Sequence, residues 1–97
     1  SVMSESGPTT MRVTLVNRQG LHARPSHLFV QTANAYVSKL RVGRADSDER
    51  VDGKSIMGMM MLAAEHGVEL VLEADGPDAD AMLRALAELV AARFGED

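Results

Sequence analysis

From residue 11 onward, the apolar residues of this chain switch between the two-residue repeat of a strand and the three-to-four-residue repeat of a helix. Residues 11–16 alternate apolar and polar side chains, which predicts a half-buried strand. Further strands are expected at 37–42, 50–52 and 68–74, the first two of these joined as a hairpin. This repeated change of period predicts a small domain that mixes short strands with helices.

The position of a proline predicts where the first helix begins. Pro25 is tolerated in a helix only near its first turn, because proline has no amide hydrogen and its ring clashes with a preceding turn. The helix that follows must therefore begin just before Pro25, at His22 or Ala23. The sequence thus places His22 at a helix N-terminus.

Two more helices are expected. Ser55 stands before the apolar run 56–65 in the position of an N-cap. His66 and Gly67 are typical of the end of such a helix, where histidine interacts favourably with the helix dipole. A last helix begins within 75–78, with a proline near its first position. Its apolar stripe has helical spacing and comprises Met82, Leu83, Leu86, Leu89, Val90 and Phe94.

The resulting order, β-α-β-β-α-β-α, predicts an α+β open-faced sandwich: a four-stranded antiparallel sheet with three helices on one face. With 97 residues, 45% of them apolar, the chain can form one domain with its own core. Residues 1–10 are small and polar and lack periodicity, so we expect a flexible N-terminal tail there and a single domain over 11–97.

Composition argues against several classes of function. The chain has no cysteine, which excludes disulfides and thiol catalysis and favours a cytoplasmic location. A net charge of −4 and only three aromatic residues argue against a nucleic-acid partner. No apolar run approaches the roughly 20 residues that cross a bilayer, and no signal peptide is evident, so no membrane partner is expected.

No metal or cofactor is expected either. His27 lies five residues after His22, a spacing that does not place both side chains on one helical face. No cysteine or paired acidic ligand accompanies them, as a metal site would require. A glycine-rich nucleotide loop is also absent from the sequence, so we do not expect the chain to bind ATP by itself.

The motif GLHARPS at residues 20–26 is the candidate chemical site. It delivers the imidazole of His22 to a helix start, where the first backbone amides lack intrahelical partners and attract anions. The amides of Ala23, Arg24 and Ser26 would bind phosphate, and the Arg24 guanidinium adds a positive charge with paired donors. We therefore expect His22 to act as a nucleophile that accepts a phosphoryl group.

GLHARPS closely resembles the active-site signature of the HPr family, the histidine phosphocarriers of the phosphoenolpyruvate-dependent sugar phosphotransferase system, and the resemblance extends over residues 11–94. In that family the motif histidine accepts a phosphoryl group on Nδ1 from enzyme I and passes it to an enzyme IIA component. His22 matches that histidine, and Arg24 matches the arginine that assists the phosphate. Ser26 stands where alanine is common, and its hydroxyl could donate a hydrogen bond to the phosphate. The resemblance implies a monomeric carrier with an HPr-like fold rather than a free-standing enzyme.

A second motif, DGKSIMG at residues 52–58, resembles the segment that an ATP-dependent HPr kinase/phosphorylase modifies in some HPr proteins. Ser55 aligns with the modified serine. Taken alone, Ser55 is a helix cap that contributes about 1 kcal/mol. The match of its neighbours implies regulatory phosphorylation, which would add about −1.5 to −2 charges and change any docking surface beside it.

Methionines cluster in the same predicted helix, at 57 and 59–61. A helix of a small domain buries one side, so some of these side chains must face solvent, although most are expected in the core. Met57 and Met60, three residues apart, are expected to form an exposed pair. Because this helix belongs to the partner-binding face of HPr proteins, the resemblance implies that Ile56, Met57 and Met60 contact partners.

Two alternatives stay open at this point. One is an HPr paralogue of a nitrogen-related or regulatory branch; the presence of His22 argues against those regulatory relatives that lack the histidine. The other is a non-catalytic binding module that acts through its methionine-rich helix alone, for which His22 would be dispensable. Transfer of a phosphoryl group to His22 distinguishes the second alternative from a carrier.

Overall fold

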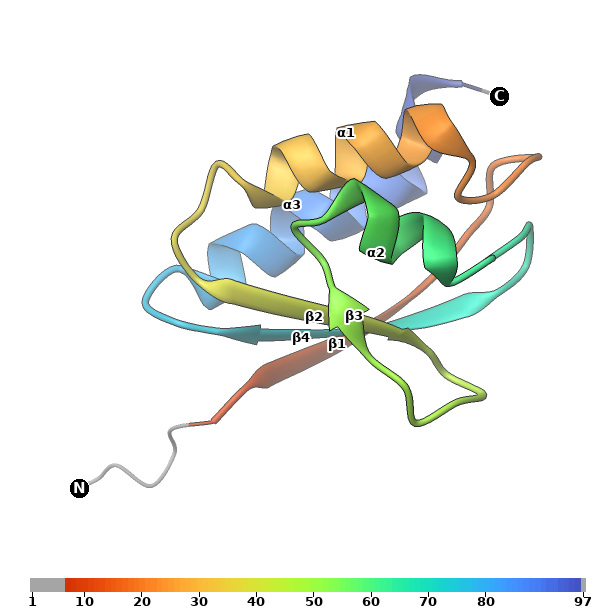
Figure 1. Ribbon diagram of the computed structural model, residues 1–97. Coiled ribbons are helices and arrows are strands. Elements are labelled where there is room, and N and C mark those ends of the chain that lie inside the picture. The colour runs from red at the N-terminus through yellow and green to blue at the C-terminus, as the bar shows by residue number, and fades with distance from the viewer. Residues whose placement is uncertain (1–6, 97) are drawn as a thin grey trace.

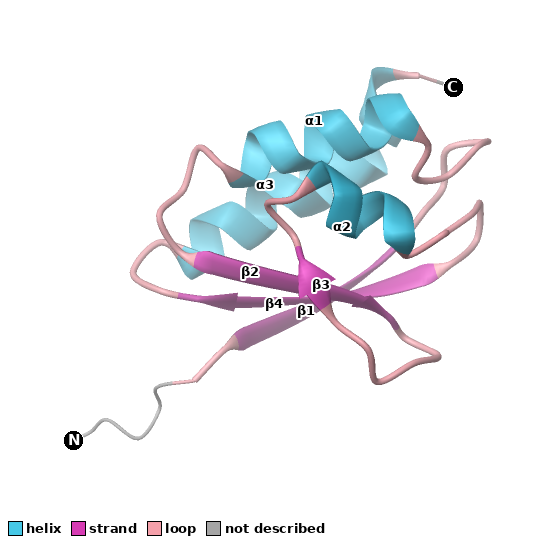
Figure 2. Cartoon of the chain, viewed as in Figure 1, coloured by secondary structure: helices cyan, strands magenta, loops and turns pink. Residues whose placement is uncertain are grey.

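Four strands form one antiparallel sheet in the order β1-β4-β2-β3, and three helices cover one of its faces (Figures 1 and 2). The computed structural model describes residues 7–96. In chain order its elements are β1 (Thr9–Thr14), α1 (Ala23–Ala33), β2 (Lys39–Arg44), β3 (Val51–Asp52), α2 (Ile56–Met61), β4 (Glu69–Asp75), α3 (Ala79–Ala91) and the short 3-10 turn η2 (Arg93–Gly95). The arrangement confirms the predicted open-faced α+β sandwich.

Strand β1 begins earlier than the sequence pattern predicts. Thr9 and Thr10, assigned above to a tail, pair with Ala74 and Glu73 of β4. The assignment of residues 1–10 to a tail is therefore wrong for these two threonines; residues 1–6 lie outside the described part of the chain. Pairing with a long neighbouring strand satisfies their backbone groups, and the β-branched threonine side chain favours extended backbone.

The core lies between the sheet and the helix layer. Leu70 and Leu72 of β4, together with Val42 of β2, point toward the helices and are fully buried. Phe29 of α1 and Leu86 of α3 meet them from the other side, also without exposed surface. Each such side chain contributes about 1.5–3 kcal/mol to folding through burial, and the helix layer is thereby held firmly above the sheet.

A carboxylate joins the start of α3 to the start of β2. Asp78 accepts hydrogen bonds from the backbone amides of Val37 and Ser38, at 3.0 and 2.9 Å, and from the Ser38 hydroxyl. The hydroxyl contributes most to holding the pKa of Asp78 below its ordinary value, and the Val37 amide follows. Because these amides bond to Asp78, Val37 stays exposed outside the sheet and β2 begins at Lys39.

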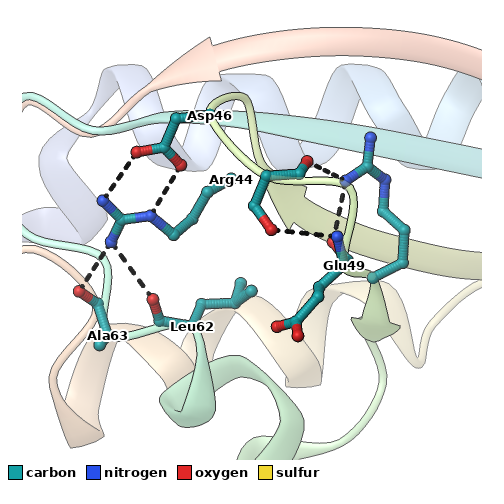
Figure 3. A network of polar contacts seen from close by, with 7 residues as sticks. Arg44, Asp46, Glu49, Leu62 and Ala63 are labelled. Carbon is teal, nitrogen blue, oxygen red and sulfur yellow. Dashed lines mark hydrogen bonds and ion pairs between the residues drawn. The ribbon is translucent and has the colours of Figure 1, made fainter.

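Helix α2 is shorter than the predicted helix over 56–65, because a side chain from the sheet binds the carbonyls beyond its last turn (Figure 3). The Arg44 guanidinium donates to the carbonyl oxygens of Leu62 and Ala63, at 3.4 and 3.1 Å. Asp46 accepts from the same guanidinium at 3.1 and 3.2 Å and fixes its plane. Ala63 adopts a left-handed φ of 51°, which ends the helix there.

His66 therefore does not close a helix, and that prediction is wrong. Its Nδ1 lies 3.2 Å from the carbonyl oxygen of Asn17, in the segment that follows β1. The amide of the next residue, Gly67, donates to the Leu15 carbonyl at 2.8 Å. The chain between α2 and β4 thus crosses over the segment that leads into α1, and the two segments hold each other in place.

Candidate functional site

The turn before α1 is pinned against the segment between α2 and β4. Gly20 has a left-handed φ of +66°, and a Cβ there would lie 2.5 Å from the Ala64 carbonyl oxygen. The Leu21 amide donates to that same oxygen at 2.9 Å, and the Leu21 side chain is buried. The residue that follows, His22, is therefore presented from a rigid turn rather than from a mobile loop.

His22 occupies the N-cap of α1, as the position of Pro25 predicted. Its backbone is extended, with φ −80° and ψ −171°, and its side chain makes no capping hydrogen bond. The imidazole is about one-third exposed, with 35% of its side-chain surface accessible. The ring thus stays partly open to solvent at the start of the helix.

Two backbone amides at this helix start are available to an anion. Neither Ala23 nor Arg24 donates its amide hydrogen to any described residue, and Pro25 has none to donate. Both residues are exposed. Unpartnered amides at the positive end of an 11-residue helix attract anionic groups. The two amides are therefore free at the helix start, and their binding of phosphate stays a prediction.

The third predicted ligand, Ser26, has no free group for a phosphate. Its amide donates to the His22 carbonyl oxygen at 3.0 Å, which is the first hydrogen bond of the helix ladder. Its hydroxyl is fully buried and donates to the Leu21 carbonyl at 3.2 Å. Neither group is available to a phosphate, and the expected role of Ser26 in binding it is wrong. Ser26 instead fastens the first turn of α1 to the preceding segment.

The Arg24 side chain is exposed beside His22 and forms no hydrogen bond with a described residue. Its positive charge acts on the nearby carboxylate of Glu96 and is one of the causes that lower the pKa of Glu96. A guanidinium that is not held by a protein acceptor can turn toward a phosphoryl group, and its paired N–H groups match two phosphate oxygens.

Two residues of the site were missed by sequence reasoning. The Oε1 atom of Glu96 lies 3.1 Å from Nε2 of His22 and accepts a hydrogen bond from Nδ2 of Asn17 at 3.0 Å. The bond with His22 is the largest cause of the lowered pKa of Glu96, and the bond with Asn17 is the next. Glu96 is 74 residues from His22 along the chain, so no local spacing could reveal this contact.

The family model described as the PTS HPr component phosphorylation site matches residues 9–92. The chain belongs to the HPr family. The phosphocarrier protein HPr of Neisseria meningitidis is 49% identical over 84 residues, which cover 87% of this chain and 92% of that protein. The crystal structure of HPr-C-His from Thermoanaerobacter tengcongensis has a TM-score of 0.86 and 38% identity, covering 92% of this chain and 98% of that one. The HPr of Bacillus anthracis has a TM-score of 0.79 and 37% identity, covering 86% and 96%.

In this HPr chain, Ser55 is the N-cap of α2. Its Oγ accepts from the Gly58 amide at 3.1 Å, as the sequence predicted. The glycines of DGKSIMG are needed for close packing: a Cβ on Gly53 would lie 2.5 Å from the Leu40 side chain, and one on Gly58 would lie 2.9 Å from the Asp52 carbonyl. The motif therefore holds a short helix tightly against β2 and β3, with Ser55 half-buried at its start.

The methionine-rich helix turns most of its apolar side chains outward. Met59 alone among the apolar side chains of α2 is buried, so the expectation that most of them are core is wrong. The exposed fractions are 38% for Ile56, 72% for Met57, 44% for Met60 and 75% for Met61. The predicted exposed pair is confirmed, and it lies in a helix that runs beside α1 (Figure 1). We call these four side chains the methionine face.

Other site types find no support in the described residues. No group of three or more histidine, aspartate or glutamate side chains within 7–96 could hold a metal ion. His27 is exposed on α1. Within the same residues, no helix has the length and apolar character needed to cross a membrane.

Proposed function

We propose that this HPr-family chain accepts a phosphoryl group on Nδ1 of His22 from phosphorylated enzyme I and passes it to an enzyme IIA component. The observation that carries the proposal is the partly exposed imidazole at the N-cap of α1 beside two unpartnered amides. The family and the partners it implies support the choice of donor and acceptor. Family membership also supports a monomer acting in the cytoplasm as our proposal for state and location.

The residues around His22 suit each stage of this transfer. The Nδ1 lone pair forms the new bond to phosphorus while the bond to the donor's leaving group breaks, and that electron pair stays with the donor. The amides of Ala23 and Arg24, the positive end of α1 and the Arg24 guanidinium stabilise the negative charge of the phosphoryl group. Reversal with an acceptor in place of the donor returns the lone pair to His22.

Incubation with phosphoenolpyruvate and enzyme I tests this function. We expect one acid-labile phosphoryl group per chain, absent from His22→Ala and unchanged in His27→Ala, because His27 lies on the same helix but away from the helix start. Mass spectrometry before and after mild acid treatment measures the adduct. An adduct that persists in His22→Ala, or none on the unaltered protein, would contradict the proposal and return the non-catalytic binding module as the better interpretation.

Acceptor specificity separates the sugar-transport branch from the nitrogen-related one. If the chain is a carrier of the sugar-transport branch, the phosphorylated protein is expected to pass its phosphoryl group to a sugar-specific enzyme IIA. Preferential transfer to a nitrogen-branch acceptor would assign the chain to that paralogous group instead. Mixing the phosphorylated chain with each class of acceptor and following loss of the label decides between them.

We propose that partner proteins dock on the methionine face and the neighbouring start of α1. Exposed methionines are flexible and polarisable, so one surface can fit several partners. The Ala64 carbonyl bonds the Leu21 amide and thereby ties the end of the α2 segment to the residue before His22. A partner that covers Ile56, Met57 and Met60 would thus have the phosphoryl acceptor at the edge of its contact area.

We further propose that Ser55 is phosphorylated by an HPr kinase/phosphorylase that uses ATP. Its place as half-buried N-cap, directly before exposed Ile56 and Met57, supports this, because the added charge would sit beside the docking surface. Incubation with ATP and the kinase is expected to give an acid-stable adduct, lost in Ser55→Ala and retained in Ser47→Ala, a similarly half-buried surface serine. Phosphate on Ser47 instead, or on neither, would leave Ser55 as a helix cap only.

A further inference from the structure

The end of the described chain makes an unusual turn toward His22. After α3, three consecutive residues have left-handed backbone: φ is 58° at Arg93, 56° at Phe94 and 76° at Gly95. This conformation is unfavourable for residues other than glycine and persists only where the surroundings hold it. Here Phe94 is buried in the core, and the Arg93 guanidinium donates to the Val16 carbonyl at 3.2 Å. The next residue is Glu96.

Two side chains, those of Asn17 and His22, contact the Glu96 carboxylate after this turn. Nδ2 of Asn17, which is fully buried, donates both to the Gly20 carbonyl at 2.8 Å and to Oε1 of Glu96 at 3.0 Å. Rotating the Asn17 amide would place its oxygen against these two acceptors, so the donor assignment follows from the partners. The same Oε1 lies 3.1 Å from Nε2 of His22. Arg24 is the remaining charged group that acts on this carboxylate.

The protonation of the ring follows from the partner of Nε2. An ionised carboxylate only accepts hydrogen bonds, so Nε2 of His22 must carry the hydrogen in this contact. In a neutral imidazole the other nitrogen, Nδ1, then holds the lone pair. When that lone pair forms a bond to phosphorus, the Nε2 hydrogen stays in place and the ring acquires positive charge. The Glu96 carboxylate faces that charge and stabilises it, as a buried aspartate does for the histidine of a serine protease.

We infer that Glu96 is a positioning residue for the phosphoryl acceptor: it holds His22 with the hydrogen on Nε2 and the lone pair on Nδ1. The inference rests on the proposed carrier function for its consequence, and on the Asn17–Glu96–His22 contacts for its geometry. It assigns a role to the left-handed turn at residues 93–95, which keeps the carboxylate beside the ring while Phe94 anchors the turn.

Ring-nitrogen NMR of the 15N-labelled chain tests the geometry without any phosphoryl donor. At a pH where His22 is neutral, we expect its signals to show the hydrogen on Nε2, and the share with the hydrogen on Nδ1 to rise severalfold in Glu96→Ala. Glu96→Gln keeps an acceptor oxygen for Nε2 of His22 and Nδ2 of Asn17, so it should retain the hydrogen on Nε2 while losing the negative charge. The His22→Ala chain identifies which of the three histidines gives each signal. The matched control is Glu88→Gln, which removes the same charge from the exposed face of α3 and should leave the His22 signals unchanged.

Transfer kinetics test the consequence. Glu96→Gln is expected to accept a phosphoryl group from enzyme I about tenfold more slowly than the unaltered chain, because it no longer stabilises the positive charge that the ring acquires, while Glu88→Gln keeps the full rate. The size of the loss is that seen when the hydrogen-bond partner of a metal-bound histidine is removed. His22 signals that do not change in Glu96→Ala, or a transfer rate that does not change in Glu96→Gln, would overturn the inference. Failure of the unaltered protein to accept phosphate would instead refute the carrier function, and the NMR result would still report on the contact.

Discussion

Gly20→Ala is expected to lower the free energy of unfolding by at least about 2 kcal/mol, which combines left-handed backbone strain with overpacking. The new Cβ would lie 2.5 Å from the Ala64 carbonyl oxygen and 2.6 Å from the Glu65 Cα, and both are backbone atoms that cannot rotate away. Relief of this clash must separate the turn from the α2–β4 segment and break the hydrogen bond between the Leu21 amide and Ala64. Urea unfolding of both proteins measures the loss.

Gly67→Ala is the matched control for this prediction. Gly67 also has a left-handed backbone, with φ +90°, but a Cβ there meets no atom within 4 Å. We expect its loss to be about 1 kcal/mol, the backbone contribution alone. Gly20→Ala should also accept phosphate more slowly at urea concentrations where it is still folded, because His22 follows the displaced turn. Equal losses of stability in the two variants would contradict the proposed contact.

Met59→Ala is expected to lower the free energy of unfolding by about 2–5 kcal/mol, whereas Met57→Ala should change it by no more than about 0.5 kcal/mol. The two side chains are two positions apart in one short helix, but Met59 has no exposed surface and Met57 is 72% exposed. Truncation of Met59 leaves a cavity between α2 and the sheet. A stability of about 5–15 kcal/mol is typical of a domain, so this loss would be a large part of it.

Binding should show the opposite order. If the methionine face is the docking surface, Met57→Ala weakens the complex with enzyme I while the fold is unaffected, and calorimetric titration at a temperature where both variants are folded would show it. Met59→Ala at that temperature should retain more affinity than Met57→Ala, because its side chain does not reach the surface. Similar unfolding free energies for the two variants would mean that α2 packs in a different orientation.

Local patterns predicted most of the elements because their causes are local. Pro25 cannot lie deep in a helix, and that alone placed His22 at the N-cap of α1. The side chain of Ser55 accepts from an amide three residues away, so its cap was equally visible in the sequence. The errors have distant causes: Thr9 and Thr10 join the sheet because β4 extends beside them, and α2 ends early because Arg44 reaches its carbonyls from β2.

The residues of the candidate site also separate into those with local causes and those with distant causes. The sequence by itself determined the family, the histidine at a helix start that we propose as the nucleophile, and the arginine beside it, since these residues are neighbours in one motif. Tertiary structure alone decided that Ser26 is buried, that Met59 is the inward residue of its helix and that Glu96 meets His22. The physical reason is that hydrogen bonds and burial depend on which segments meet in space, and contacts across 74 residues leave no periodicity to read.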